Sequence, residues 1–167
     1  IRTKAGDDKR SIAFINIFEK IFNIYQKRLK DSEEIDFEDM ITKASELILS
    51  KKFLVHWKYI IIDEFQDISR GRYDLIKSFL EVNPNIKLFC VGDDWQSIYR
   101  FAGSDISLMK NFRKYFGPLN TCIVDLDQTF RFNNMISSVS EKFITKNPDQ
   151  IKKSLKTLAY YDTPQVF

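Results

Sequence analysis

The sequence contains little glycine, proline and cysteine, and each shortage excludes a class of protein. Its 167 residues include 5 Gly, 4 Pro, 2 Cys and 1 His. So few glycines and prolines exclude a collagen-like chain and a flexible Gly/Pro-rich linker. The two cysteines form no Cys-x-x-Cys pair, and they provide neither a disulfide framework nor a typical zinc site. We therefore expect a globular protein from a reducing compartment.

Long apolar runs are also missing. No stretch approaches the roughly 20 apolar residues that a membrane-spanning helix needs. The first thirty residues mix acidic and basic side chains, which is not the pattern of a secretory leader. Both observations favour a cytoplasmic location without a membrane partner. Hydrophobic residues make up 44% of the chain and charged residues 29%, which suits one domain or one domain with part of a second.

Charge is unevenly distributed although the net charge is only +3. Residues 1–30 carry eight basic and three acidic side chains, whereas residues 31–50 carry seven acidic side chains and one Lys. Such blocks fit solvated helix faces, and an interaction surface is an equal alternative. The cluster of Lys152, Lys153 and Lys156 is interpreted as a solvated face rather than a track for phosphates.

Two amphipathic helices are predicted in the N-terminal third. Between residues 9 and 30, apolar side chains recur at helical spacing. A second helix should begin at Asp36, whose carboxylate can cap the free amides ahead of a stripe running from Phe37 to Ile48. These residues are expected to form a helical pair.

After Trp57, short β-branched runs alternate with helices, which predicts an α/β fold. Strands are expected at 59–62, 86–91 and 121–126, the last two holding buried cysteines, and a final helix is expected up to Asn147. Alternation indicates parallel strands, and uninterrupted apolar strands are typical of sheets covered by helices on both faces. Ligands in such sheets bind beyond the carboxyl ends of the strands.

Polar clusters follow each predicted strand at that position. Asp63 and Glu64 end the first strand and suit ATP hydrolysis, in which an Asp holds Mg²⁺ and a neighbouring Glu accepts the proton of the attacking water. An acidic helix start is the alternative. The second cluster, residues 91–105, places Trp, Gln, Tyr, Arg and Phe within seven positions, as a segment between phosphate and a stacked base would, unless the rings simply pack beneath the loop. In the third cluster, Arg131 could reach a phosphate.

In this order and spacing, the three clusters resemble motifs II, III and IV of the superfamily 1 DNA helicases related to UvrD, Rep and PcrA. The matching segments are DEFQD at 63–67, GDDWQSIY at 92–99 and TFR at 129–131. The run VGDDWQSIYRFAGSD and the TFRFN segment are most similar to the helicase IV branch. The resemblance covers about residues 20–155 and implies a partial P-loop, RecA-like motor domain with an N-terminal helical insert.

The resemblance also implies roles for individual residues. Asp63 and Glu64 would be the Mg²⁺ residues, with Glu64 as general base, and Gln66 would belong to the ATP site. Gln96 would sense the γ-phosphate, and Arg131 would contact it from the far wall of the cleft.

Three further residues, Tyr99, Arg100 and Phe101, fall where the family contacts single-stranded DNA, and rings there suit base stacking. Relatives commonly have Trp in place of Phe101 and an Arg directly after it, so the sequence departs from the family pattern at these two positions.

The resemblance is incomplete because no GxxxxGK[ST] phosphate loop occurs. We therefore expect an internal fragment of an ATP-dependent 3′ to 5′ helicase that is inactive alone and works with the remaining helicase domains. Its expected divisions are 1–55 (helical), 56–128 (first motor domain) and 129–167 (start of the second). Exposed sheet edges would favour a dimer.

Two other functions are alternatives to the helicase. One is a non-catalytic module that binds DNA or a protein and derives from a helicase. The other is a metal nuclease using Asp63, Glu64, Asp93 and Asp94, which would leave Gln96, Tyr99 and Arg131 without a role.

Overall fold

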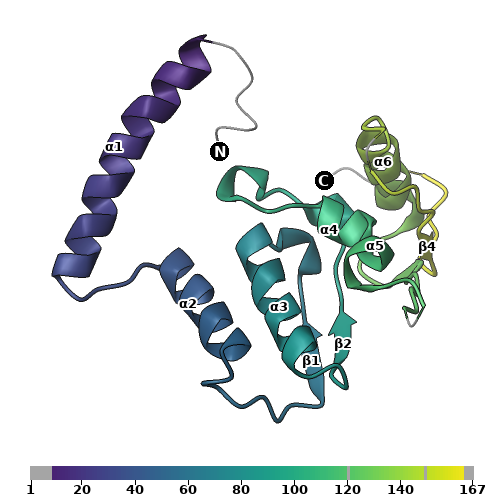
Figure 1. Cartoon of the computed structure of the whole chain (residues 1–167). Coiled ribbons are helices and arrows are strands. Elements are labelled where there is room, and N and C mark those ends of the chain that lie inside the picture. The colour runs from purple at the N-terminus through teal and green to yellow at the C-terminus, as the bar shows by residue number, and fades with distance from the viewer. Residues whose placement is uncertain (1–8, 120, 149, 164–167) are drawn as a thin grey trace. The chain divides into compact units, whose positions relative to one another are not determined.

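The computed structural model describes residues 9–119, 121–148 and 150–163, and the chain forms two compact units (Figure 1). The first unit is Ile1–Leu54 and the second is Val55–Phe167. In the part of the chain that is described, no helix is both long and apolar enough to cross a membrane.

The first unit contains the two predicted helices, α1 (Lys9–Asp31) and α2 (Phe37–Leu49). Asp36 caps α2, because its Oδ1 accepts a hydrogen bond of 2.7 Å from the Asp39 backbone N–H. The Tyr25 hydroxyl donates to the other oxygen of Asp36 at 2.9 Å and ties the end of α1 to this cap. The prediction of a helix starting at Asp36 is confirmed.

The apolar face of α1 is largely exposed. Phe14, Phe18 and Phe22 stack along the helix with ring centroids 6.4 and 5.7 Å apart, yet all three are open to solvent. Ile15 is the buried apolar residue of this helix and Ile48 that of α2. Packing within the unit therefore contributes little to its stability.

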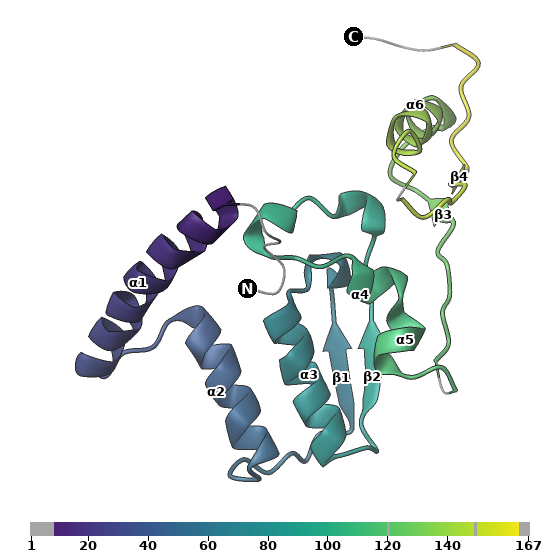
Figure 2. The same ribbon diagram turned by 45° about the horizontal axis from the view of Figure 1, so that its top comes forward.

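The second unit is built on two parallel strands, β1 (Tyr59–Ile62) and β2 (Lys87–Cys90), with Ile62 opposite Cys90. The helices α3 (Arg70–Val82), α4 (Ser107–Lys110) and α5 (Phe112–Phe116) lie beside them (Figure 2). The core consists of Phe65, Ile68, Ile76 and Leu108, with Ile62, Leu88 and Cys90 packed against it. Parallel pairing and the α/β class are as predicted.

The described helices cover only one face of this sheet, which corrects the expectation of helices on both faces. Residues with odd numbers on β1 point away from the core, and Ile61 is 73% exposed and Phe89 60% exposed. Side chains alternate across a strand, so the same register that buries Ile62 and Leu88 exposes these two. An apolar strand sequence indicated burial on both sides, but the described helices supply only one cover.

The third predicted strand, 121–126, is wrong. Residues 121–127 form neither helix nor strand, and Cys122 is exposed. A strand needs a partner for its backbone groups. In this part of the chain, the strands that do pair are β3 (Gln128–Thr129) and β4 (Lys156–Thr157), which are parallel. The helix α6 (Asn134–Ile144) lies between them in the chain and is capped by Asn133.

Candidate active site

The carboxyl ends of β1 and β2 meet and continue as two polar loops, a first loop (63–67) and a second loop (92–105). Beyond the strands, the Val91 N–H donates to the Ile62 carbonyl and the Phe65 N–H donates to the Val91 carbonyl, both at 2.9 Å. These bonds extend the ladder past the sheet and hold the loops side by side. The sequence placed both clusters at this edge, and the structure brings them together.

The first loop turns sharply at Glu64, which has left-handed backbone angles (φ 50°, ψ 43°). Such angles are strained for a residue with a side chain. The Glu64 N–H donates to the Asp63 Oδ1 at 2.9 Å, which supports the turn. Both carboxylates are exposed at the sheet edge, where they are accessible to a ligand.

Gln66 connects the two loops from a buried position. Its side chain is 2% exposed, donates from Nε2 to the Glu64 Oε2 at 2.7 Å and accepts at Oε1 from the Asp93 N–H at 2.9 Å. Gly92 permits this approach, because a Cβ there would lie 2.8 Å from the Gln66 Oε1 and 3.1 Å from the Phe65 N. The residue predicted to bind the cofactor is thus a buried bridge between Glu64 and the second loop.

Asp93 organises the start of the second loop and holds Gln96. Its Oδ1 accepts from the Trp95 N–H at 3.1 Å, and its Oδ2 accepts from the Gln96 Nε2 at 2.9 Å. Burial raises the pKa of the Asp93 carboxyl, but hydrogen bonds from Lys153 and Gln96 outweigh it and leave the pKa below its ordinary value. The carboxylate is therefore charged at neutral pH, and Gln96 is held at the surface above it.

The DNA-contact residues predicted from the sequence lie together on the second loop. Tyr99 and Phe101 are exposed, with ring centroids 6.1 Å apart and planes at 49°, and Phe101 is 86% exposed. Arg100 between them is exposed as well and begins a short 3₁₀ helix, Arg100–Ala102. The rings do not pack beneath the loop, so that alternative is wrong for Phe101.

The far end of the second loop is fastened to the start of α3. Ser104 pairs with Ser69 in a single antiparallel bridge, and the Asp105 N–H donates to the Ile68 carbonyl at 2.8 Å. Arg70 forms an ion pair of 2.9 Å with Asp105 and lies 5.1 Å from the centre of the Tyr115 ring. The exposed rings are therefore carried by a loop that is fixed at both ends.

Arg131 is the predicted site residue that the structure does not join to the others. It is exposed, and its backbone N–H donates to the Thr129 Oγ1 at 3.3 Å. Within residues 9–119, 121–148 and 150–163, no hydrogen bond or ion pair connects its side chain with Glu64, Gln66 or Gln96.

Asp94, Trp95 and Lys153 take part in the site, although the helicase interpretation of the sequence gave none of them a role. Lys153 pairs with Asp93 and Asp94 and is therefore not part of a solvated face, which corrects that interpretation. Lys156, by contrast, pairs with Asp127 while remaining largely exposed. A pairing across 60 positions leaves no local signal in the sequence.

Asp63 and Glu64 suit a magnesium site that also uses phosphate ligands, but the acidic residues do not form a nuclease centre. Asp63 and Glu64 are accessible oxygen donors, and Mg²⁺ needs only one or two protein carboxylates when phosphates supply other ligands. Among the described residues, no group of three or more His, Cys, Asp or Glu side chains is arranged to hold a metal ion. Asp94, moreover, is 1% exposed and paired with Lys153, so it is not available as a ligand of a nuclease centre.

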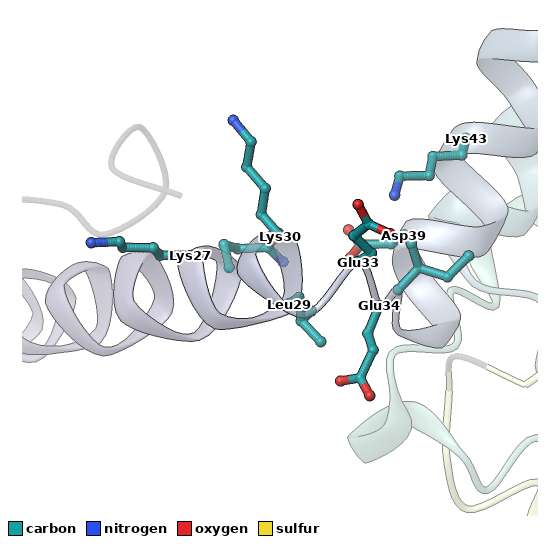
Figure 3. A pocket seen from close by; sticks show the side chains of 9 residues that line it. Lys27, Leu29, Lys30, Glu33, Glu34, Asp39 and Lys43 are labelled. Atoms are coloured by element: carbon teal, nitrogen blue, oxygen red, sulfur yellow. The ribbon is translucent and has the colours of Figure 1, made fainter.

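A separate pocket of about 630 Å³ lies in the first unit at the junction of α1 and α2 (Figure 3). It is lined by Lys27, Lys30 and Lys43 together with Glu33, Glu34 and Asp39, and by three uncharged residues. Basic and acidic side chains face the same space, so the lining does not select a ligand of either charge.

The fold and the paired loops define an α/β protein with its site at the carboxyl ends of parallel strands. A family model described as the UvrD/REP helicase N-terminal domain matches residues 3–117. The chain belongs to the UvrD/REP helicase family.

Individual relatives agree with this assignment. The chain is 40% identical over 152 residues to DNA helicase IV of Escherichia coli K12, covering 91% of the chain and 22% of that protein. It is 32% identical over 142 residues to the ATP-dependent DNA helicase PcrA of Bacillus subtilis 168 (82% and 19%). It is 32% identical over 143 residues to the ATP-dependent DNA helicase Rep of Buchnera aphidicola (83% and 21%). The chain therefore spans about a fifth of the length of these relatives.

Proposed function

We propose that the chain is a part of an ATP-dependent 3′ to 5′ DNA helicase, which couples hydrolysis of Mg-ATP to movement along single-stranded DNA and unwinding of a duplex. The observation that carries this proposal is the hydrogen-bonded series Glu64, Gln66, Asp93 and Gln96. It connects an accessible pair of carboxylates to an accessible amide across two strand ends, which supports placing a metal ligand, a general base and a phosphate contact at one edge of the sheet.

In this proposal the first loop handles metal and water. Asp63 would hold Mg²⁺, and the ion would neutralise charge that develops on the phosphate oxygens. Glu64 accepts a proton from the attacking water, and its strained turn places the carboxylate at the sheet edge. The buried Gln66 amide fixes the orientation of Glu64 through its hydrogen bond.

The second and third clusters sense phosphate and contact DNA. Gln96 responds to the γ-phosphate, and Arg131 reaches it when the two motor domains close. Tyr99 and Phe101 stack on bases, which contributes about 1–3 kcal/mol per base without reading the sequence. Arg100 between them neutralises a backbone phosphate.

The proposed organisation places residues 1–55 in a helical insert, 56–128 in the first motor domain and 129–167 at the start of the second. Because no phosphate loop occurs in the sequence, the isolated chain should not hydrolyse ATP. The remaining domains of the longer helicase would supply it.

Steady-state ATP hydrolysis with Mg²⁺, with and without single-stranded DNA, tests the proposal in two proteins. The 167-residue chain should show no turnover, whereas the longer protein should show turnover stimulated by DNA. In the longer protein, Glu64→Gln should lower kcat by about 10²–10⁴-fold, as expected on removal of a general base. DNA-stimulated turnover by the chain alone, abolished by Glu64→Gln, would contradict the fragment proposal.

The non-catalytic binding module is the other outcome of the same assay. It would show DNA binding without turnover in the longer protein. Phe101→Ala tests the contribution of base stacking to DNA binding. It should weaken binding to an oligo-dT strand by about 5- to 100-fold. Phe143→Ala, at a ring on α6 that is also largely exposed, is the matched control and should leave affinity unchanged.

A further inference from the structure

Residues 151–153 contact the second loop through a set of polar interactions around Asp94. The Lys153 Nζ lies 2.7 Å from the Asp94 Oδ1, and the Ile151 N–H donates to the Asp94 Oδ2 at 2.8 Å. Asp94 is 1% exposed, and the same short segment places a cation beside one oxygen of this buried carboxylate and a hydrogen-bond donor at the other. A buried charge without partners is costly, so these contacts stabilise the loop in this conformation.

Trp95 adds a second connection at the same place. Its indole Nε1 donates to the Ile151 carbonyl at 3.0 Å, and the Lys153 ammonium lies 5.1 Å from the centre of its ring. A cation over an aromatic face is attracted by the ring quadrupole. Trp95 thus contacts this segment through both its indole N–H and its ring.

Lys153 also reaches Gln96 through one shared carboxylate. Lys153 pairs with the Asp93 Oδ1, while the Asp93 Oδ2 accepts from the Gln96 Nε2 at 2.9 Å. The backbone N–H of the same Asp93 is held by Gln66, which in turn holds Glu64. One ammonium group is therefore connected to both ends of the proposed hydrolysis site.

The connection runs between parts of the second unit that the chain itself joins only by an extended stretch. Residues 121–127 form neither helix nor strand, and Lys153 follows α6. The contact is mainly polar, as are interfaces between parts of a chain that can move relative to one another. Burial lowers the pKa of the Lys153 ammonium, but its hydrogen bonds to Asp93 and Asp94 outweigh this effect and leave the pKa above its ordinary value. Lys153 is therefore charged at neutral pH.

We propose that Lys153 is a positioning residue that sets the orientation of Gln96 through Asp93 and so couples movement of residues 151–153 to the phosphate-sensing loop. The catalytic consequence rests on the proposed function. The contact itself does not, which allows the two to be tested separately.

The contact is tested first in the 167-residue chain by ¹⁵N NMR of the Gln96 side-chain amide and the Trp95 indole N–H. Trp57→Phe assigns the indole signal, since the chain has two Trp residues. Lys153→Met keeps the aliphatic stem but removes the charge, and it should shift both signals. Lys152→Met, at an exposed neighbour, should shift neither. Unchanged Gln96 signals in Lys153→Met would overturn the inference whatever the activity.

The catalytic consequence is tested in the longer protein with a double-mutant cycle. Lys153→Met should lower DNA-stimulated kcat by about fivefold or more with a smaller change in the KM for ATP, and Lys153→Arg should restore most of it. In a Gln96→Ala background, Lys153→Met should cause no further loss. If the fold losses of kcat in the two single variants multiply in the double variant, the proposed route through Gln96 is overturned. Absence of turnover in the unsubstituted protein would instead contradict the proposed function, while the NMR result would still decide the contact.

Discussion

Gln66 and Asp93 are 27 positions apart in the sequence, yet the buried Gln66 Oε1 accepts the Asp93 backbone N–H at 2.9 Å. This bond joins the two polar loops beneath the surface where the proposed chemistry takes place. The orientation of Glu64 depends on the same side chain, since the Gln66 Nε2 donates to the Glu64 carboxylate. Disturbing one amide should therefore affect both the stability of the unit and the geometry of the site.

Gln66→Leu should destabilise the chain. The substitution leaves the Asp93 N–H without its acceptor in a buried place, which costs about 1–3 kcal/mol in the free energy of unfolding. Urea denaturation followed by circular dichroism measures this. Gln96→Leu, at an exposed glutamine of the same network, should change stability by only about 0.5 kcal/mol. Equal effects of the two substitutions would contradict the bridging role of Gln66.

Gly92→Ala should also destabilise, for a steric reason. The new Cβ would lie 2.8 Å from the Gln66 Oε1 and 3.1 Å from backbone nitrogens of the first loop, and overpacking of this kind costs about 1–3 kcal/mol. Gly103→Ala is the comparison, because its Cβ would meet open space and only its positive φ is unfavourable. The Gln66 side-chain amide signal should shift in the first variant and stay in place in the second.

The two cysteines should differ in reactivity. Burial raises the pKa of the Cys90 thiol to about 12, so almost no thiolate is present at pH 8, whereas Cys122 is exposed. Iodoacetamide at pH 8 should therefore label Cys122 at least about tenfold faster than Cys90. Mass spectrometry of labelled peptides over time measures the two rates, and unfolding in urea should equalise them. Rapid labelling of folded Cys90 would show that β2 is not packed as described.

The stability of the Asp36 cap at the start of α2 should depend on pH. The Asp39 N–H and the Tyr25 hydroxyl donate to Asp36 and lower the pKa of its carboxyl. A carboxyl whose pKa is lowered by folding stabilises the folded state at any pH above its unfolded pKa of about 3.9. This contribution is lost as the pH falls through the pKa of the folded state. Chemical shifts of the Asp39 amide between pH 6 and pH 2 should report the loss.

Asp36→Asn provides the control for that titration. Asn caps helices about as well as Asp but carries no titrating group, so α2 should begin at the same residue without the pH dependence. Asp36→Ala should remove the cap at every pH. Persistence of the transition in Asp36→Asn would assign it to another acidic residue.

The exposed face of the β1–β2 sheet should promote association. Ile61 and Phe89 lie on it without a cover from the described helices, and apolar sheet faces with free edges favour pairing between copies. Sedimentation velocity at increasing concentration should show a dimer that Ile61→Lys weakens. Val139→Lys, at an exposed apolar position on α6, should have no effect. A clean monomer at high concentration would contradict the expectation.

Local patterns in the sequence determined several features by themselves. Helical spacing and a capping carboxylate predicted α1 and α2, because a helix depends on neighbours within a few positions. Short apolar runs between helices predicted β1, β2 and their parallel pairing. The order of polar clusters after these strands indicated the site at the sheet edge and the helicase family, since adjacent strand ends must bring such clusters together.

Tertiary structure alone decided the rest. Residues 121–126 have an apolar, strand-like sequence but no partner strand in the part of the chain that is described, and a strand forms only when its backbone groups are paired. Whether the face bearing Ile61 is covered depends on which elements are present, not on the strand itself. Gln66, Asp94 and Lys153 acquired their partners across 27 to 60 positions, and no local pattern encodes a contact at that separation. The sequence thus determined which residues stand at the strand ends, and the packing of the chain decided which of them are connected.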